Sequence, residues 1–170
     1  MKKNILISTF TFLTFCLFNL TGQVDNTYKD PTLNYSFKYP KEYKSTPPKN
    51  NLIDFTATDG YGGSIVINNK DFPFSSTPFD QVTKKTFEDF PKPAARTFEV
   101  TKFYRTKIDN YNAIIAYCTM TSTKSSVKQI SVFVNYKNYN FTLILGTLSK
   151  YFEKEEANFI KSINSIKFKV

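Results

Sequence analysis

The chain contains no histidine and no tryptophan, and only two cysteines and five glycines occur among its 170 residues. Without histidine it cannot form a Ser-His-Asp triad, a Cys-His pair or the usual zinc and copper sites. Three of the five glycines fall in the Gly-Tyr-Gly-Gly stretch at 60–63. No Lys-Ser or Lys-Thr follows this stretch, and a strand rather than a helix comes next. It is therefore predicted to be a hairpin turn and not a phosphate-binding loop.

Reactive thiols and metal ligands are also scarce. Cys16 lies in an apolar N-terminal segment, so only Cys118 remains if that segment is removed, and no internal disulfide can then form. Cys118 stands in a run that is apolar on both faces, which predicts a buried structural thiol. Asp54 and Asp59 are not part of a spaced calcium loop, so no metal and no cofactor is expected. The three glutamates within 153–156 are expected to favour the positive start of a helix, not to form a catalytic pair.

The N-terminus has the three parts of an export signal. Lys2 and Lys3 give a positive start, and the segment at 5–20 is uncharged and rich in Phe, Leu, Ile and Thr. Gly22 supplies a small residue before the expected cleavage point. The apolar segment is short and carries several hydroxyl groups, whereas a spanning helix needs about 20 predominantly apolar residues. An uncleaved anchor is the alternative.

Export defines the expected organisation of the chain. Bulky Phe15, directly before Cys16, argues against lipoprotein processing. We expect a signal peptide at 1–22, a single domain at 23–170 and no transmembrane segment after cleavage. The protein is accordingly expected to be secreted or periplasmic.

Basic residues outnumber acidic ones. The chain has 23 Lys and Arg against 14 Asp and Glu, and removal of 1–22 leaves 21 against 14, a net charge of +7. Such an excess favours anionic partners, for example phospholipid head groups or acidic polymers of the cell envelope, through long-range attraction. An ordinary soluble surface of a chain rich in Asn and Lys would carry a similar charge. No nucleic-acid partner is expected.

Alternation of apolar and polar residues predicts a series of strands. The expected strands are 33–39, 52–58, 64–68, 97–108, 111–121, 127–136 and 139–147. The segments at 111–121 and 139–147 are apolar on both faces, as is typical of interior strands of a sheet covered on both sides. Tight turns at 109–110 and 137–138 are expected to connect neighbouring strands as hairpins.

Two helices complete the expected fold. Thr77 and Pro78 predict the start of a helix at 77–90, and Ser149 is expected to cap a second helix at 150–162. The chain is therefore predicted to be α+β, with a central, mostly antiparallel sheet of about six strands and helices packed on its faces.

Several local sequences resemble PsbP-like proteins. The segment at 28–43 is similar to their opening, where a tyrosine or aspartate segment leads into a strand ending in Tyr-Pro. The segments at 108–113, 139–143 and 159–168 resemble their hairpin, a later strand, and their closing helix and tail. Asn110 stands where many relatives have Gly, and Asn can fill such a turn.

The resemblance implies a PsbP-like α/β/α sandwich, with an antiparallel sheet between helices. This fold serves an extrinsic photosystem II subunit, a nuclear Ran-binding protein and exported bacterial proteins. Members generally bind or assist other components, so the resemblance implies a non-enzymatic role. It supplies no binding motif for individual residues, because one fold serves many functions.

Two classes of function remain. The first is an exported, non-enzymatic binding or accessory protein of the cell envelope, with a protein or an anionic envelope component as partner. The second is a hydrolase or other enzyme that uses only Asp, Glu, Lys, Tyr or Ser. Tyr61, Phe72 and Phe74 are candidate contact residues, because they lie in loops beside Gly and Pro. The same aromatic residues could instead fold back onto the core. No catalytic residue is predicted.

Overall fold

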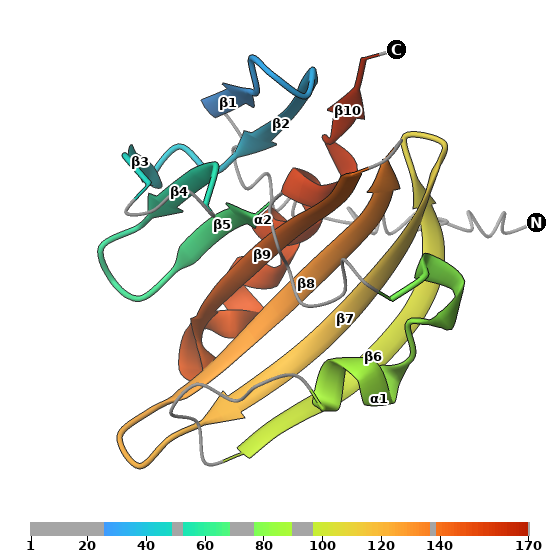
Figure 1. Ribbon diagram of the computed structural model, residues 1–170. Coiled ribbons are helices and arrows are strands. Elements are labelled where there is room, and N and C mark those ends of the chain that lie inside the picture. The colour runs from blue at the N-terminus through green and yellow to red at the C-terminus, as the bar shows by residue number, and fades with distance from the viewer. Residues whose placement is uncertain (1–25, 49–52, 69–76, 90–96, 137–138, 170) are drawn as a thin grey trace, which may run out of the picture.

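The computed structural model of the chain describes residues 26–48, 53–68, 77–89, 97–136 and 139–169 (Figure 1). Its elements are β1 (Asn26–Lys29), β2 (Tyr35–Tyr39), β3 (Lys44–Thr46), β4 (Phe55–Thr58), β5 (Ser64–Asn68), η1 (Phe79–Gln81), α1 (Lys84–Glu88), β6 (Thr97–Ile108), β7 (Tyr111–Thr121), β8 (Ser126–Tyr136), β9 (Tyr139–Leu148), η2 (Ser149–Tyr151), α2 (Phe152–Asn164) and β10 (Lys167–Phe168). The expected signal peptide and two of the candidate contact residues, Phe72 and Phe74, lie outside the described residues.

The strands form two antiparallel sheets. The large sheet has seven strands in the order β3-β4-β5-β9-β8-β7-β6, and the small sheet has three in the order β1-β2-β10. Figure 1 shows α2 behind the large sheet, α1 in front of it and the small sheet above one end. The predicted α+β architecture is confirmed.

Six of the seven strands of the large sheet were predicted from the sequence. The bounds of β5, β6 and β7 agree with the prediction, and β8 and β9 each differ by one residue at one end. Both β7 and β9 lie between two other strands, as expected. The short strands β1, β3 and β10 were missed, because two to four residues are too few to show a period.

The helix predicted at 77–90 is much shorter. Thr77 does not begin it; η1 comes first, and α1 then starts after Thr83. The Thr83 hydroxyl accepts the Thr86 N–H at 3.3 Å, while the Thr86 hydroxyl oxygen accepts the Thr83 N–H at 3.0 Å. This reciprocal cap satisfies donors at both ends of the first turn, which is why the helix begins here.

The second predicted helix begins at Phe152, two residues later than expected. Ser149 does not cap it, because the Ser149 hydroxyl lies 2.7 Å from the Ser126 hydroxyl, and a 3-10 turn precedes the helix. At 13 residues, α2 is the longest helix in the described part of the chain. Among the described residues, no helix combines the length and apolarity that crossing a membrane requires.

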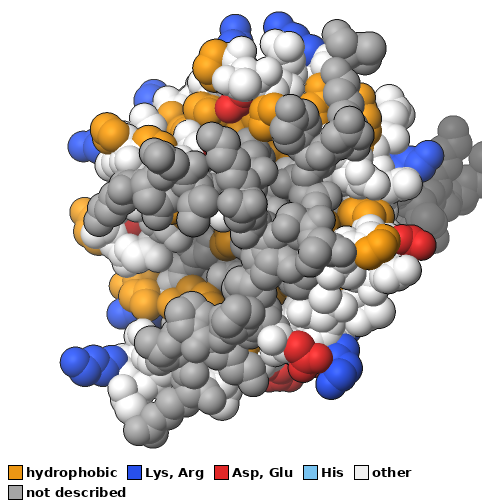
Figure 2. All heavy atoms as spheres, in the orientation of Figure 1, with side chains coloured by type: hydrophobic (Ala, Val, Ile, Leu, Met, Phe, Trp, Pro, Cys, Tyr) orange, Lys and Arg blue, Asp and Glu red, His pale blue; other side chains and the backbone are white. Residues whose placement is uncertain are grey.

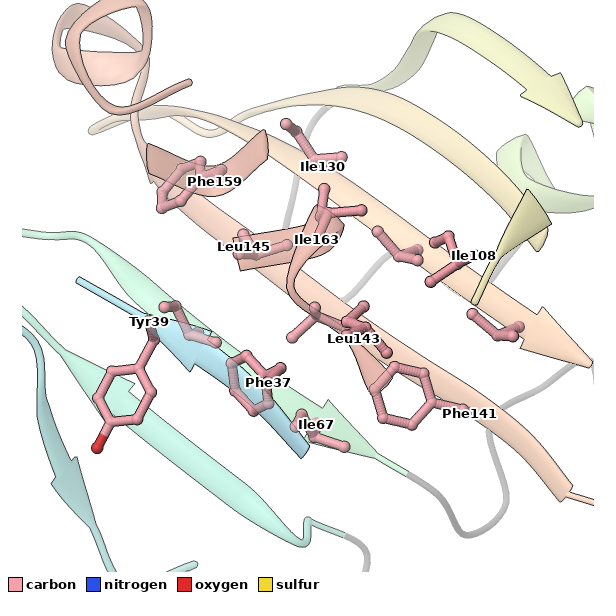
Figure 3. Packing of buried hydrophobic residues seen from close by; sticks show 14 of the residues in the cluster. Phe37, Tyr39, Ile67, Ile108, Ile130, Phe141, Leu143, Leu145, Phe159 and Ile163 are labelled. Atoms are coloured by element: carbon pink, nitrogen blue, oxygen red, sulfur yellow. The ribbon is translucent and has the colours of Figure 1, made fainter. Parts of the chain in front are cut away.

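Two hydrophobic cores lie on opposite faces of the large sheet. The first joins β2, β5, β8 and β9 to α2, and Figure 3 shows Phe37, Leu145 and Phe159 among its members. The second packs Phe133 of β8 with neighbours from β6 and β7 and with Phe87 of α1. This double burial explains why the central strands are apolar on both faces.

A bulge in β6 corrects the predicted faces of that strand. Strict alternation places Phe98, Val100, Tyr104 and Ile108 on one face. The register shifts between Val100 and Lys102, and the inserted residue exchanges the two faces. Val100 therefore lies in the core beside α1, whereas Tyr104 and Ile108 pack on the side of α2.

Cys118 is the buried structural thiol that the sequence predicts. Its side chain is 2% exposed and belongs to the core beside α1. Burial raises the pKa of the thiol to about 12, and a hydrogen bond with Ser131 offsets only part of this rise. The sulfur therefore stays protonated at neutral pH and is not a nucleophile.

Candidate functional site

A pocket of about 370 Å³ opens where the β4–β5 hairpin meets the start of α2. Its lining residues are Glu42, Tyr43, Asp59, Tyr61, Tyr151, Lys154, Glu155 and Asn158. Within the described ranges, Tyr61 and Tyr151 are the large hydrophobic side chains that are exposed, at 81% and 41%, and both line this pocket. We call these eight residues the tyrosine pocket, and it is the candidate site.

The β4–β5 turn holds Tyr61 at the rim of the tyrosine pocket. Gly60 and Gly62 have φ of 79° and 112°, the left-handed region that glycine adopts without strain. The carboxylate of Asp59 accepts the N–H of Tyr61 at 2.7 Å and that of Gly63 at 2.8 Å. Two glycines and one capping carboxylate thus present an aromatic ring to solvent.

Tyr43 forms the buried wall of the pocket. Its side chain is 1% exposed, and its hydroxyl has no hydrogen-bond partner among the described residues. A Cβ at Gly63 would overlap both this hydroxyl and the Asp59 carboxylate, so only glycine fits there. Burial raises the pKa of Tyr43, and the charges of Glu155, Asp59 and Glu42 raise it further. The phenol therefore stays neutral.

Acidic groups outnumber basic ones in the tyrosine pocket. Glu42, Asp59 and Glu155 face one lysine, Lys154, which gives the lining a formal charge of −2. In the part of the chain that the structure describes, no ion pair joins these carboxylates to a Lys or Arg. Over the whole chain the net charge is +9, and Figure 2 shows basic side chains around the outline of one face. The pocket is thus a local negative region on a basic protein.

Two further hollows of about 400 Å³ lie elsewhere on the sheet and beside η2. In the first, the Lys102 ammonium lies 5.1 Å from the Tyr117 ring centroid, and Glu153 and Glu156 supply opposite charge. The second is lined by serines and two lysines and has no aromatic ring. No group of three His, Cys, Asp or Glu able to hold a metal occurs among the described residues.

The sequence singled out one residue of the tyrosine pocket. The structure places Tyr61 at its rim. The contact role suggested for Tyr61 and for the two phenylalanines at 72 and 74 stays a prediction for all three. Tyr43, Tyr151 and Glu155 were not foreseen. Tyr43 lies in the loop after β2, whereas Tyr151 and Glu155 lie in the η2–α2 segment, so no local motif relates Tyr43 to the other two. The short polar segment after the Tyr-Pro strand end was the only sign that Tyr43 leaves the sheet.

The tyrosine pocket offers groups suited to binding a ligand. It contains no histidine and no thiol, and Tyr43 stays protonated. Carboxylate oxygens, an amide and aromatic rings provide hydrogen-bond acceptors and apolar surface.

Replacing Tyr43 by phenylalanine is expected to stabilise the protein by about 1 kcal/mol, because a buried polar group without a partner costs about 1–3 kcal/mol. The ring and its packing on Phe159, at 6.4 Å between centroids, are retained. Urea unfolding measures the change. Tyr28→Phe is the control, because the Tyr28 hydroxyl donates to Asp30 at 3.1 Å and its loss should destabilise. A less stable Tyr43→Phe variant would show that the hydroxyl contributes to folding.

A seven-stranded antiparallel sheet with α2 on one face, α1 on the other and a small sheet at one end defines a PsbP-like fold. No family model and no curated protein matches the chain by sequence. Solved structures do match. Cyanobacterial PsbP (CyanoP) from Synechocystis sp. PCC 6803 superposes with a TM-score of 0.68 and 15% identity, over 85% of this chain and 92% of that one.

Two other solved structures share the fold. The Ran-binding protein Mog1p of Saccharomyces cerevisiae has a TM-score of 0.58 and 6% identity, over 84% of this chain and 94% of its own. LpqN of Mycobacterium tuberculosis, described as involved in cell envelope biogenesis, has a TM-score of 0.55 and 10% identity, over 88% of this chain and 87% of its own. At these identities the likeness shows the fold alone, and it confirms the PsbP-like architecture predicted from the sequence.

Proposed function

We propose that the protein is an exported accessory protein of the cell envelope that binds a partner protein and catalyses no reaction. The tyrosine pocket carries this proposal, because it gathers the two tyrosines that are exposed among the described residues on a rigid scaffold, and its lining contains no thiol and no histidine. Two neighbours with the same fold support it: Mog1p is a Ran-binding protein, and LpqN is involved in cell envelope biogenesis. Export, to the periplasm or the medium, rests on the signal-like segment at 1–22, with 23–170 as a single domain.

A protein partner fits the tyrosine pocket better than an anionic envelope component does. Exposed tyrosines are enriched at protein interfaces, where their rings supply large contact area. The three carboxylates would repel an anion at this position. An anionic partner attracted by the net positive charge would therefore bind another surface. No nucleic-acid partner is proposed.

Recovery of the protein from its native envelope tests both parts of the proposal. We expect its intact mass to lack 1–22, and we expect one specific partner to be captured from envelope extract. Tyr61→Ala, Tyr151→Ala should lose this partner, while the exposed-residue control Lys107→Ala, Lys124→Ala should retain it. A mass that includes 1–22 would refute export. Equal capture by both double variants, or hydrolysis of an envelope substrate, would refute the proposed role.

A further inference from the structure

We propose that the tyrosine pocket binds the primary ammonium group of a lysine side chain displayed by the partner protein. This inference rests on the proposed function, because it names the chemical group through which the partner is recognised. Charge, hydrogen bonding and aromatic surface lead to it independently.

Charge comes first. The lining carries a formal −2, since Glu42, Asp59 and Glu155 outnumber Lys154. Among the described residues no ion pair within 4.0 Å neutralises these carboxylates. The other described carboxylates do not line the pocket, and although the Lys150 ammonium on the Tyr151 ring adds one positive charge at the rim, the pocket stays negative in a chain of net charge +9. An incoming cation would therefore be attracted here and not to the surrounding surface.

The Tyr43 hydroxyl is a buried group that lacks a hydrogen-bond partner among the described residues. Buried polar groups are nearly always hydrogen-bonded, so an unpaired one in a pocket wall indicates a missing partner. A primary ammonium has three N–H donors and no acceptor. The pocket offers the matching set: carboxylate oxygens and the lone pairs of one hydroxyl.

Tyr61 and Tyr151 add aromatic surface to the pocket. The Lys150 ammonium already lies 4.7 Å from the centroid of the Tyr151 ring, which shows that this ring accepts a cation on its face. Tyr61 lies on its glycine turn, lines the same pocket as the start of α2 and is 81% exposed. A lysine side chain would pack its aliphatic stem against these rings and place its charged end among the carboxylates.

Lysine fits better than arginine for a geometric reason. A guanidinium is a wide planar fork that binds best to one carboxylate in a bidentate manner. The carboxylates here come from three separate segments, the loop after β2, the β4–β5 turn and α2, and line one pocket. A compact ammonium with donors in three directions matches such an arrangement.

Titration of the purified protein with small probes tests the inference. The probes are acetyl-Gly-Lys-Gly-amide, the same peptide with acetylated lysine, its arginine counterpart, and butylammonium chloride. Amide chemical shifts at 59–63 and 154–158 report binding. We expect the lysine peptide to bind at least tenfold more tightly than the acetylated one, and its affinity to fall with added salt.

Matched variants locate the binding. Glu42→Gln, Glu155→Gln should weaken the lysine peptide at least tenfold. Glu99→Gln, Glu153→Gln removes the same charge from exposed positions outside the tyrosine pocket and should change the affinity less than twofold. Tyr43→Phe, which retains the ring, should weaken binding although it stabilises the fold.

Each outcome decides the inference. Binding of both the lysine peptide and butylammonium, or of the peptide alone, supports it. Binding of butylammonium alone would show that the ligand is a free amine, and it would overturn the inference that a lysine side chain of a protein supplies the ammonium. The inference is also overturned if no probe binds, if the acetylated peptide binds as tightly as the lysine peptide, or if the arginine peptide binds more tightly. It is overturned as well if both glutamate double variants lose the same affinity for the lysine peptide. If Glu42→Gln, Glu155→Gln still captures the envelope partner while the tyrosine double variant does not, this inference fails and the proposed function stands.

Discussion

Replacing Phe168 by alanine is expected to lower the free energy of unfolding by about 3–5 kcal/mol, the usual cost of removing a buried phenylalanine ring. Phe168 lies two residues from the end of the chain but is only 6% exposed. Its ring stacks on Tyr136 with centroids 4.4 Å apart and meets Phe141 edge-on at 5.4 Å. Because whole domains are stable by about 5–15 kcal/mol, this single change should bring the protein close to unfolding.

The expected loss of stability is large because Phe168 joins the two sheets. Its backbone lies in β10 of the small sheet, paired with Tyr35, while its ring packs on β8 and β9 of the large sheet. The Asp109 carboxylate accepts the Phe168 N–H at 2.7 Å and holds this end in place. Burial alone would raise the pKa of Asp109, but this hydrogen bond and the contact with Lys167 outweigh it and lower the pKa.

Urea unfolding followed by circular dichroism measures the effect. Lys169→Ala, one residue further on and exposed, is the control and should change stability by less than about 0.5 kcal/mol. A loss below about 1 kcal/mol for Phe168→Ala would mean that the C-terminal strand does not close the core. Acidification should weaken the Asp109 contact, because stability from a lowered carboxyl pKa is lost as the pH falls through that pKa.

The long strands could be predicted because their signals are local. Period-two alternation and tight turns define β6 to β9 within one or two residues. Asp109 and Asn110, with φ of 47° and 73°, adopt the positive φ expected of a two-residue hairpin turn. The bulge at Val100 to Lys102 could not be seen, because one inserted residue leaves the composition of the strand unchanged.

The site was largely invisible to sequence reasoning. Tyr61 was recognised, since flanking glycines mark an exposed turn. Tyr43 and Tyr151 were not recognised. Whether each side chain is buried or exposed depends on segments that are distant in the sequence, and Tyr43 is buried whereas Tyr151 is exposed. Burial of Tyr43 depends on Gly63 and α2, and tertiary packing alone brings these together. A pocket formed by two loops and the start of a helix, from separate parts of the chain, has no periodicity.

The role of Arg105 cannot be predicted from alternation, which would place this residue at an ordinary exposed position of β6. Its guanidinium donates to the carbonyl oxygens of Phe79 at 3.1 Å, Asp80 at 2.8 Å and Val82 at 2.7 Å. It also lies 5.4 Å from the Phe79 ring centroid. One side chain therefore attaches the η1–α1 segment to the edge strand of the large sheet and helps to cover the core around Phe133.

Replacing Arg105 by alanine is expected to lower the free energy of unfolding by about 2–3 kcal/mol. A hydrogen bond to a charged group contributes about 1.5–3 kcal/mol, and solvent exposure reduces the sum of the three. Arg105→Lys should recover less than half of the loss, because an ammonium lacks the planar fork that reaches several carbonyls at once. Lys107→Ala, on the same strand and exposed, is the control.

Hydrogen exchange separates a local from a global effect of the Arg105 substitution. Amides of α1 and of the turn before it should exchange at least tenfold faster in Arg105→Ala, because these groups open without unfolding the sheet. β7 and β9 are interior strands held on both sides. The exchange rates of their amides should rise only by the amount that the loss of global stability predicts. Unchanged exchange in α1 would show that packing of Phe87 alone holds this helix on β6. Equal acceleration everywhere would show that the η1–α1 segment and the large sheet unfold as one unit, so that the guanidinium contributes to the whole fold and not to one attachment.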